Sequence, residues 1–284
     1  MNRRAVTTVT SPCHWPAIVA AFLVVAALTA GRPAGASAAA TTHDRRAAVK
    51  PTVVLVHGAF ADGSSYAPVV RRLQAAGYPV LVPANPLRGI GYDSAYLAGV
   101  LASINGPIVL VGHSYAGALI GNVDDARVKA LVYIAAFAPL QGETLQQLVS
   151  HAPGSLLSPS ALDVDTYQTL DGRLAPEGTV KPQLFHTILA GDLPVAATRV
   201  AAASQRPTAL STLTDPAGPP AWATIPSWYL VAGADNAVGT ANERFMARRM
   251  HATTVVAKGA SHIVMLSQPD KVIGLILDAA AGRR

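Results

Sequence analysis

The sequence predicts an α/β fold with a mostly parallel sheet of about six strands and flanking helices. Two observations lead to this prediction. Short, nearly continuous apolar runs recur along the chain, as is typical of strands that are buried on both faces. Segments with helical spacing of apolar residues separate these runs, and this regular alternation is typical of parallel sheets. The length of 284 residues, with 51% hydrophobic and 13% charged residues, suits one domain with a large core.

Each expected element follows from a local pattern. Apolar, often β-branched runs predict six strands: Thr52–His57, Val80–Pro83, Ile108–Val111, Val128–Ala135, Trp228–Ala232 and Thr253–Ala257. Apolar residues at helical spacing predict five helices: Tyr66–Ala76, Ser94–Ile104, Ala116–Asn122, Ala241–Met250 and Pro269–Ala280. Residues 139–226 interrupt the alternation, because they are rich in Pro, Ser, Thr and Leu and show short helical patterns without a strong strand. We therefore expect one domain over residues 51–284 with an inserted helical lid at about 139–226.

The N-terminal segment has the pattern of a secretory signal peptide. Arg3 and Arg4 precede the apolar run Ala17–Leu28, and small residues continue to Ala40. The run is short for a membrane span, so a signal peptide over residues 1–40 is favoured over an uncleaved anchor. Residues 41–50 are polar and are expected to form a disordered tail. The sequence thus predicts a secreted or extracytoplasmic protein without a stable membrane anchor after cleavage.

Charge and cysteine content exclude several classes of function. Cys13 is the only cysteine and precedes the apolar run, so the mature chain is expected to lack disulfides. Removal of residues 1–40 takes away three arginines and no acids, which lowers the net charge from +6 to about +3. The sequence contains no cluster of basic residues interleaved with aromatic ones, and no nucleic-acid partner is expected. Metal-binding and phosphate-binding motifs are also missing, so no metal and no cofactor are expected.

The segment Gly112–Gly117, which reads Gly-His-Ser-Tyr-Ala-Gly, is the first candidate for a catalytic motif. It follows an apolar run and precedes a segment that is expected to begin a helix. A strand, a tight turn and a helix are the context of a nucleophile elbow, in which Ser114 would be the nucleophile. Ala116 stands where the motif usually has a glycine, so the match is imperfect.

Two other segments supply the groups that acyl transfer needs. The loop after the first strand begins His57-Gly58-Ala59-Phe60, and an N–H group of Ala59 or Phe60 could join that of Tyr115 in binding an oxyanion. Asp235 follows a buried-strand pattern, and His262 lies on a late loop after another. The chain order Ser114, Asp235, His262 is the order found in α/β-hydrolases.

With these residues the chain resembles the α/β-hydrolase superfamily, nearest the small esterase group that includes plant methylesterases and hydroxynitrile lyases. The resemblance runs from about Pro51 to near the C-terminus and rests on four segments: His57–Ser65, Gly112–Gly117, Gly233–Asp235 and Gly259–Pro269. It implies an α/β-hydrolase fold and a triad of Ser114 as nucleophile, His262 as base and Asp235 as the acid that orients the imidazole. Tyr66, where relatives often carry tryptophan, and Ala116 depart from the pattern.

Other residues near the motifs are candidates for the substrate pocket or for supporting roles. Phe60, Tyr115, Phe137 and Met265 are on loops that are expected to converge on Ser114, where they could form an apolar substrate pocket. His57 and His113 are next to the site in the sequence, but we expect them to support the oxyanion loop and the elbow rather than transfer protons. Asp62 and Asp93 are expected to be turn or cap residues.

A serine at the elbow favours acyl-enzyme chemistry, so the sequence predicts a serine hydrolase that cleaves small-molecule carboxylic esters. Hydroxynitrile lyase or perhydrolase activity on the same triad is one alternative. Lyase relatives carry threonine and lysine where this chain has Gly58 and Ile263, which favours the esterase branch. A non-catalytic hydrolase-fold protein that binds a ligand is the other alternative.

Overall fold

The computed structural model describes residues 49–284, which form the predicted α/β architecture with a parallel main sheet. The expected signal peptide and nearly all of the expected tail lie outside the described residues. Within the described part of the chain, no helix is both long and apolar enough to cross a membrane.

Six parallel strands form the main sheet in the order β2-β1-β3-β4-β8-β9. All six predicted strands are present: β1 (Thr52–Val56), β2 (Val80–Leu81), β3 (Ile108–His113), β4 (Val128–Ile134), β8 (Ser227–Ala232) and β9 (Thr253–Ala257). β3 lies in the interior of the sheet, between β1 and β4, and all six of its residues are buried. The loop that follows β3 therefore leaves the sheet near its middle, where loops from several strands can surround it.

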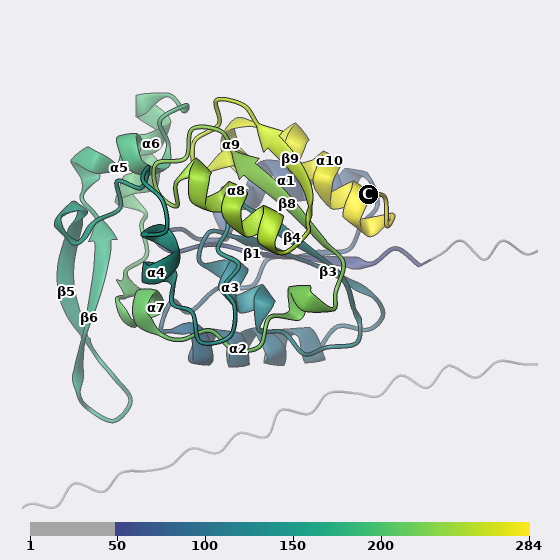
Figure 1. Cartoon of the computed structure of the whole chain (residues 1–284), viewed down its shortest axis with the longest axis horizontal. Coiled ribbons are helices and arrows are strands. Elements are labelled where there is room, and N and C mark those ends of the chain that lie inside the picture. Colours follow the sequence, from purple (N-terminus) through teal and green to yellow (C-terminus); the bar gives the residue numbers. More distant parts are fainter. Residues whose placement is uncertain (1–48) are drawn as a thin grey trace, which may run out of the picture. The chain divides into compact units, whose positions relative to one another are not determined.

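Helices cover both faces of this sheet (Figure 1). Alternate residues of each strand enter opposite cores, for example Val53 and Leu55 on one side and Val54 and Val56 on the other. α1 (Ala67–Ala75) and α10 (Pro269–Ala280) pack on the first side, where Leu73 and Ile276 are fully buried. The second side is covered by three helices, α2 (Ile90–Ala102), α3 (Ala116–Gly121) and α8 (Thr240–Arg249).

Residues 139–226, called the lid below, are inserted in the sequence between strands β4 and β8, which are neighbours in the sheet. The predicted helical lid contains helices, but three further elements that the sequence did not indicate form a small antiparallel sheet, β5-β6-β7. The elements of the lid are α4 (Leu145–Val149), η2 (Pro159–Ala161), β5 (Leu162–Gln168), β6 (Leu174–Val180), α5 (Pro182–Leu189), α6 (Val195–Ala203), β7 (Thr208–Ala209), α7 (Ser211–Thr214) and η3 (Ala221–Ala223).

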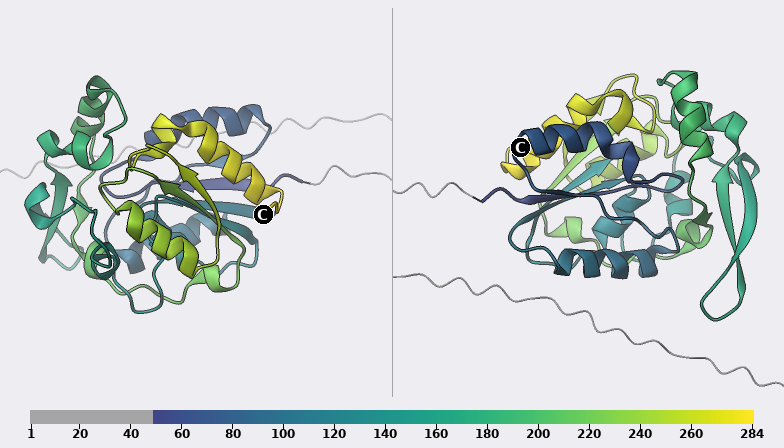
Figure 2. Two further views of the ribbon diagram at one scale, coloured as in Figure 1. Left: turned by 45° about the horizontal axis from the view of Figure 1, so that its top comes forward. Right: turned by 180° about the vertical axis from the view of Figure 1, so that it is seen from behind.

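The β5–β6 hairpin is mostly solvent-exposed, so its sequence does not have the pattern of a buried strand. Its strands are rich in polar residues and carry no continuous apolar run of the kind that predicts the main sheet. The turn between them has a readable signature, Asp171-Gly172, and Gly172 has a φ of +82°. Figure 2 shows the hairpin projecting away from the main sheet.

The remaining elements are short and lie beside the predicted motifs. η1 (Gly63–Tyr66) follows the His57 loop, and the Asp62 side chain caps it by accepting a hydrogen bond from the backbone N–H of Ser64. α9 (Val264–Ser267) directly follows the loop that carries His262.

Candidate active site

Ser114 occupies a sharp turn between β3 and α3. Its φ of +54° is in the left-handed region, which is strained for a residue with a side chain. Strand and helix pass so close that a Cβ atom added to Gly112 would lie 2.7 Å from the carbonyl oxygen of Ala116. A Cβ on Gly117 would overlap the carbonyl oxygen of Phe137. The two outer glycines are therefore required by close packing, whereas the methyl group of Ala116 fits between them in a fully buried position.

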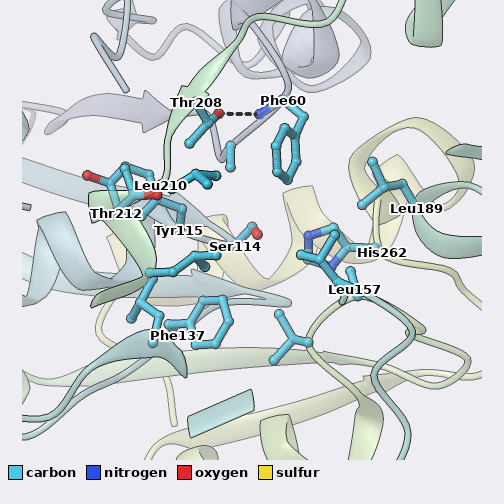
Figure 3. A pocket seen from close by; sticks show the side chains of 15 residues that line it. Phe60, Ser114, Tyr115, Phe137, Leu157, Leu189, Thr208, Leu210, Thr212 and His262 are labelled. Atoms are coloured by element: carbon cyan, nitrogen blue, oxygen red, sulfur yellow. Dashed lines mark hydrogen bonds between the residues drawn. The ribbon is translucent and has the colours of Figure 1, made fainter. Parts of the chain in front are cut away.

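The structure brings Ser114, His262 and Asp235 together, and all three residues are buried. His262 Nδ1 is 2.6 Å from Asp235 Oδ2, a hydrogen bond that fixes the orientation of the imidazole ring. Figure 3 shows the hydroxyl of Ser114 pointing toward that ring. No hydrogen bond within 3.5 Å joins the two groups in the part of the chain that the structure describes. Such contacts are often long in the absence of substrate and shorten during the reaction.

Asp235 is held as an ionised carboxylate. Its Oδ1 atom accepts hydrogen bonds from the backbone N–H groups of Ala237 (2.6 Å) and Val238 (2.9 Å). Burial by itself would raise the pKa of Asp235, but the charge and hydrogen bond of the His262 imidazole outweigh this effect and hold that pKa well below its ordinary value. The carboxylate can therefore stabilise a positive charge on His262.

The oxyanion loop passes directly against the elbow. A Cβ added to Gly58 would lie 2.7 Å from the Cβ of Ser114, so the loop backbone can approach the nucleophile only with glycine at this position. Phe60 has a φ of +60°, and its N–H group donates a hydrogen bond of 3.1 Å to Thr208 Oγ1 of the lid (Figure 3). Over the described residues, no acceptor is found for the N–H groups of Ala59 and Tyr115, and both residues line the pocket that contains Ser114.

Tyr115 is anchored by Asp93, for which the sequence predicts only a turn or cap role. Its hydroxyl group donates a hydrogen bond of 2.7 Å to Asp93 Oδ2, and Asp93 also accepts one from the backbone N–H of Arg88. Burial raises the pKa of Asp93. Asp93 lies in the first turn of α2, as expected for a cap residue, and it also holds the side chain of Tyr115 in place. A carboxylate in the first turn of a helix gives no sign of so distant a partner.

His57 and His113 both hold neighbouring loops in place. His57 donates from Nδ1 to the Gly58 carbonyl and accepts at Nε2 from the backbone N–H of Asn85, with both distances 3.0 Å. His113 Nε2 donates to the carbonyl of His262 at 3.1 Å. Burial lowers the pKa of His57 and lowers that of His113 further. Both imidazoles are thus neutral groups that connect the loops around the site.

The pocket above Ser114 is narrow and apolar. Its free volume is about 30 Å³, and Figure 3 shows Phe60, Tyr115 and Phe137 among the side chains around it. Met265 does not line this pocket: it is a fully buried residue of α9 in the core on the α10 side of the sheet. Its loop position in the sequence was misleading, because the chain turns into a helix two residues after His262.

A second cavity of about 390 Å³ adjoins the first beneath the lid. Both cavities are lined by Phe137, Leu157, Leu210 and Leu213, which form the wall between them. His262 is the one histidine among the residues that line these two cavities, and neither lining includes Asp, Glu, Lys or Arg. Groups of three or more residues suited to hold a metal ion do not occur in the range 49–284.

Three known proteins show what this chain is similar to. A carbendazim hydrolyzing esterase from Nocardioides sp. is 36% identical over 117 residues, which cover 35% of this chain and 47% of that protein, about half of its length. A pyrethroid hydrolase from Sphingobium wenxiniae is 28% identical over 250 residues, covering 80% of this chain and 87% of that protein. The crystal structure of polyneuridine aldehyde esterase matches with a TM-score of 0.69 over 81% of this chain and 98% of that chain, and its identity of 21% shows the fold alone.

The relatives named esterase and hydrolase support a hydrolase function for this chain. The model of the alpha/beta hydrolase family matches residues 53–275, which include Ser114, Asp235 and His262. Since this match spans well over half of the sequence and agrees with the observed sheet order, the chain belongs to the alpha/beta hydrolase family.

Proposed function

We propose that this protein hydrolyses carboxylic esters through an acyl-enzyme formed on Ser114. The observation that carries the proposal is the arrangement of three buried groups. A serine held at positive φ points toward an imidazole whose other nitrogen is hydrogen-bonded to an ionised carboxylate. This arrangement activates a hydroxyl group that is otherwise a poor nucleophile.

In the proposed reaction, His262 accepts the proton of Ser114 while Oγ attacks the ester carbonyl carbon. The carbonyl oxygen becomes an oxyanion, and the N–H groups of Tyr115 and Ala59 donate hydrogen bonds to it. His262 then gives its proton to the leaving alcohol, and the C–O bond breaks to leave an acyl-enzyme. A water molecule repeats these steps and releases the acid. Because His262 must be neutral to accept a proton, activity should decline on the acidic side of the pH range.

Ala59 is preferred to Phe60 as the second oxyanion donor for a geometric reason. The N–H group of Phe60 is already engaged by Thr208 Oγ1, whereas no acceptor occupies that of Ala59 within the described residues. Thr208 in turn would hold the oxyanion loop in a fixed conformation. Preorganised donors of this kind stabilise charge without having to reorient during the reaction.

The linings of the two cavities support a proposal for the substrate class. The absence of acidic and basic residues from both linings favours a neutral, apolar ester, because no lining carboxylate or cation could pair with a charged group. The pocket at Ser114 has room for little more than the reacting ester group. We infer that the larger part of the substrate, on either its acyl or its alcohol side, enters the second cavity.

Replacement of Leu210 by alanine tests this division of the site. Leu210 is partly buried and belongs to the wall between the cavities, so its truncation should admit bulkier groups at modest cost in stability. Two substrate series, nitrophenyl esters of increasing acyl length and acetates of increasing alcohol size, are measured with wild type and variant. For each protein, kcat/KM of the largest ester in a series is divided by that of the smallest. In one of the two series, this ratio should be about tenfold higher for Leu210→Ala than for wild type.

The exposed Leu174 of β6 provides the matched control, since Leu174→Ala removes the same atoms at a residue that belongs to neither lining. An unchanged size preference of Leu210→Ala in both series would contradict the proposed role of the second cavity.

Hydroxynitrile lyase activity is disfavoured by the same geometry. Lyase relatives carry a threonine in the oxyanion loop where this chain has Gly58. A threonine at position 58 would clash here, because its Cβ would lie against the Cβ of Ser114. Ile263 replaces their lysine, is buried, and bonds through its N–H to the carbonyl of Leu189. The test compares nitrophenyl esters with mandelonitrile on one purified sample. Ester hydrolysis should exceed cyanide release by a wide margin, and the reverse result would assign the protein to the lyase branch.

We also propose that the protein is exported, on the basis of the pattern in residues 1–40. N-terminal sequencing of protein recovered outside the cytoplasm tests this: the mature chain should begin near residue 37–41, and the presence of Met1 or Cys13 in the exported protein would contradict the proposal.

A further inference from the structure

Glu243 is a fully buried carboxyl group behind the site. It lies in the first turn of α8, and its Oε2 atom accepts a hydrogen bond of 2.8 Å from the backbone N–H of Ala232. Ala232 is the last residue of β8, only three residues before Asp235. The carbonyl oxygen of Ala232 accepts a further bond from the hydroxyl of Thr240, at the start of the same helix. Glu243 is thus fixed close to the loop that carries Asp235.

The second oxygen of Glu243, Oε1, is buried and finds no hydrogen-bond partner within 3.5 Å in the described part of the chain. The groups that act on the Glu243 carboxyl are Asp235 from the loop after β8, Tyr229 from β8 and Arg244 from its own helix. Asp235 is already ionised through its bonds to two backbone N–H groups and to His262. A second ionised carboxylate beside it, away from water, would be strongly unfavourable.

The burial of Glu243 beside the ionised Asp235 implies that the Glu243 carboxyl is protonated. Burial, together with the negative charge of Asp235 and a side-chain interaction between the two carboxyl groups, raises the pKa of Glu243 well above its ordinary value. The nearby charge of Arg244 and the hydrogen bond from Ala232 oppose this rise but do not cancel it. A protonated carboxyl has an O–H donor, and a buried donor needs an acceptor. The carboxylate of Asp235 is the acceptor that this environment offers.

We propose that Glu243 is a neutral carboxylic acid that donates a hydrogen bond to the carboxylate of Asp235 and so positions Asp235 behind His262. Glu243 touches neither substrate nor nucleophile, so it is a positioning residue, and its role rests on the proposed function of the Ser114 site. The proton on Glu243 also weakens the hold of Asp235 on a positively charged imidazole, which favours the neutral form of His262 that accepts the serine proton.

Two substitutions of Glu243 distinguish hydrogen bonding to Asp235 from a role in which the side chain only fills space in the core. In Glu243→Gln, the amide oxygen can accept from Ala232 and the NH₂ group can donate to Asp235, so both bonds survive. This variant should keep kcat/KM within about twofold of wild type. Its activity should also decline at the same acidic pH as that of wild type, so the acid limb of the pH profile should not move. Glu243→Met has a similar size but can make neither bond. Its kcat should fall roughly tenfold with little change in KM, since the reacting groups are misplaced rather than the substrate site.

The pH profile distinguishes the two protonation states of Glu243. Without a donor, Asp235 stabilises the imidazolium more strongly, so the acid limb of Glu243→Met should move to higher pH. If Glu243 were instead ionised in the wild type, Glu243→Gln would remove a negative charge near His262. The acid limb of that variant would then move to lower pH, and the proposal would be overturned. Equal activity in the Gln and Met variants would overturn it as well.

A stability measurement gives an independent reading that needs no catalysis. A protein that keeps a glutamic acid protonated in its fold loses stability as pH rises above the pKa of that group in the unfolded chain, 4.5. Glu243→Gln lacks this penalty, so its melting temperature should match that of wild type near pH 4 and exceed it increasingly toward pH 7. A decrease toward pH 7 would show that Glu243 is ionised in the fold.

Glu143 offers a control of opposite sign. Burial opposes its ionisation, but hydrogen bonds from Arg249 lower the pKa of Glu143 below its ordinary value. Glu143→Gln should therefore lose stability relative to wild type as pH rises toward 7. If wild-type protein hydrolyses no ester, the proposed function fails, whereas the melting curves still decide the state of Glu243.

Discussion

Replacement of Ser114 by alanine is expected to lower kcat for ester hydrolysis by a factor of about 10⁶. The loss is this large because the acyl-enzyme cannot form without the hydroxyl group, and His262 and Asp235 then have no nucleophile to activate. Alanine can occupy the strained turn as serine does, since it adds no atoms to the closely packed elbow. The measurement is the initial rate on a nitrophenyl ester, with the melting temperature as a check of folding.

Ser103→Ala serves as the matched control, because the hydroxyl of Ser103 only bonds the Val100 carbonyl at the end of α2. It should leave the rate unchanged. A Ser114→Ala protein with wild-type turnover would show that another group is the nucleophile, and the proposed reaction would be wrong.

Asp235→Asn is expected to lower kcat by a factor of about 10⁴ with the fold intact. The Oδ1 atom of Asp235 accepts from the N–H groups of Ala237 and Val238, so an asparagine must direct its carbonyl oxygen there. Its NH₂ group would then face Nδ1 of His262, which could only accept that hydrogen bond. The proton of the imidazole would move to the other nitrogen, where it faces Ser114 and cannot take up the serine proton.

Single-turnover and steady-state rates on the same nitrophenyl ester measure this effect. Asp62→Asn is the control, since asparagine caps a helix about as well as aspartate does and Asp62 caps η1. A loss in Asp235→Asn no larger than in Asp62→Asn would remove Asp235 from the proposed reaction.

The main sheet was predictable because its strands are buried on both faces. Runs such as Ile108–Val111 and Trp228–Ala232 have no polar residues to compete with a strand assignment, and the structure places both in the interior of the sheet. The β5–β6 hairpin follows a different rule, since solvent covers most of its surface and its pairing depends on backbone bonds. Sequence patterns based on burial carry little information about such strands.

The groups around Ser114 were predictable to the extent that they lie within local motifs. Ser114, Asp235 and His262 each follow a strand of the main sheet, and parallel strands bring their carboxyl ends to the same edge. Thr208 and Glu243 lie in no motif. Thr208, in a two-residue strand of the lid, accepts a hydrogen bond from Phe60, and Glu243, in a helix, accepts one from Ala232. Contacts of this kind depend on tertiary packing, which a single sequence does not reveal.

Reaction with a fluorophosphonate tests the central claim most directly, because this reagent captures the hydroxyl that the proposed triad activates. Tryptic cleavage should give the peptide 89–127, which contains Ser94, Ser103 and Ser114, and fragment masses identify the modified serine. We expect one phosphonyl group per chain, on Ser114, and a parallel loss of ester hydrolysis. Modification of any other serine, or full activity after Ser114 is modified, would contradict the proposed function.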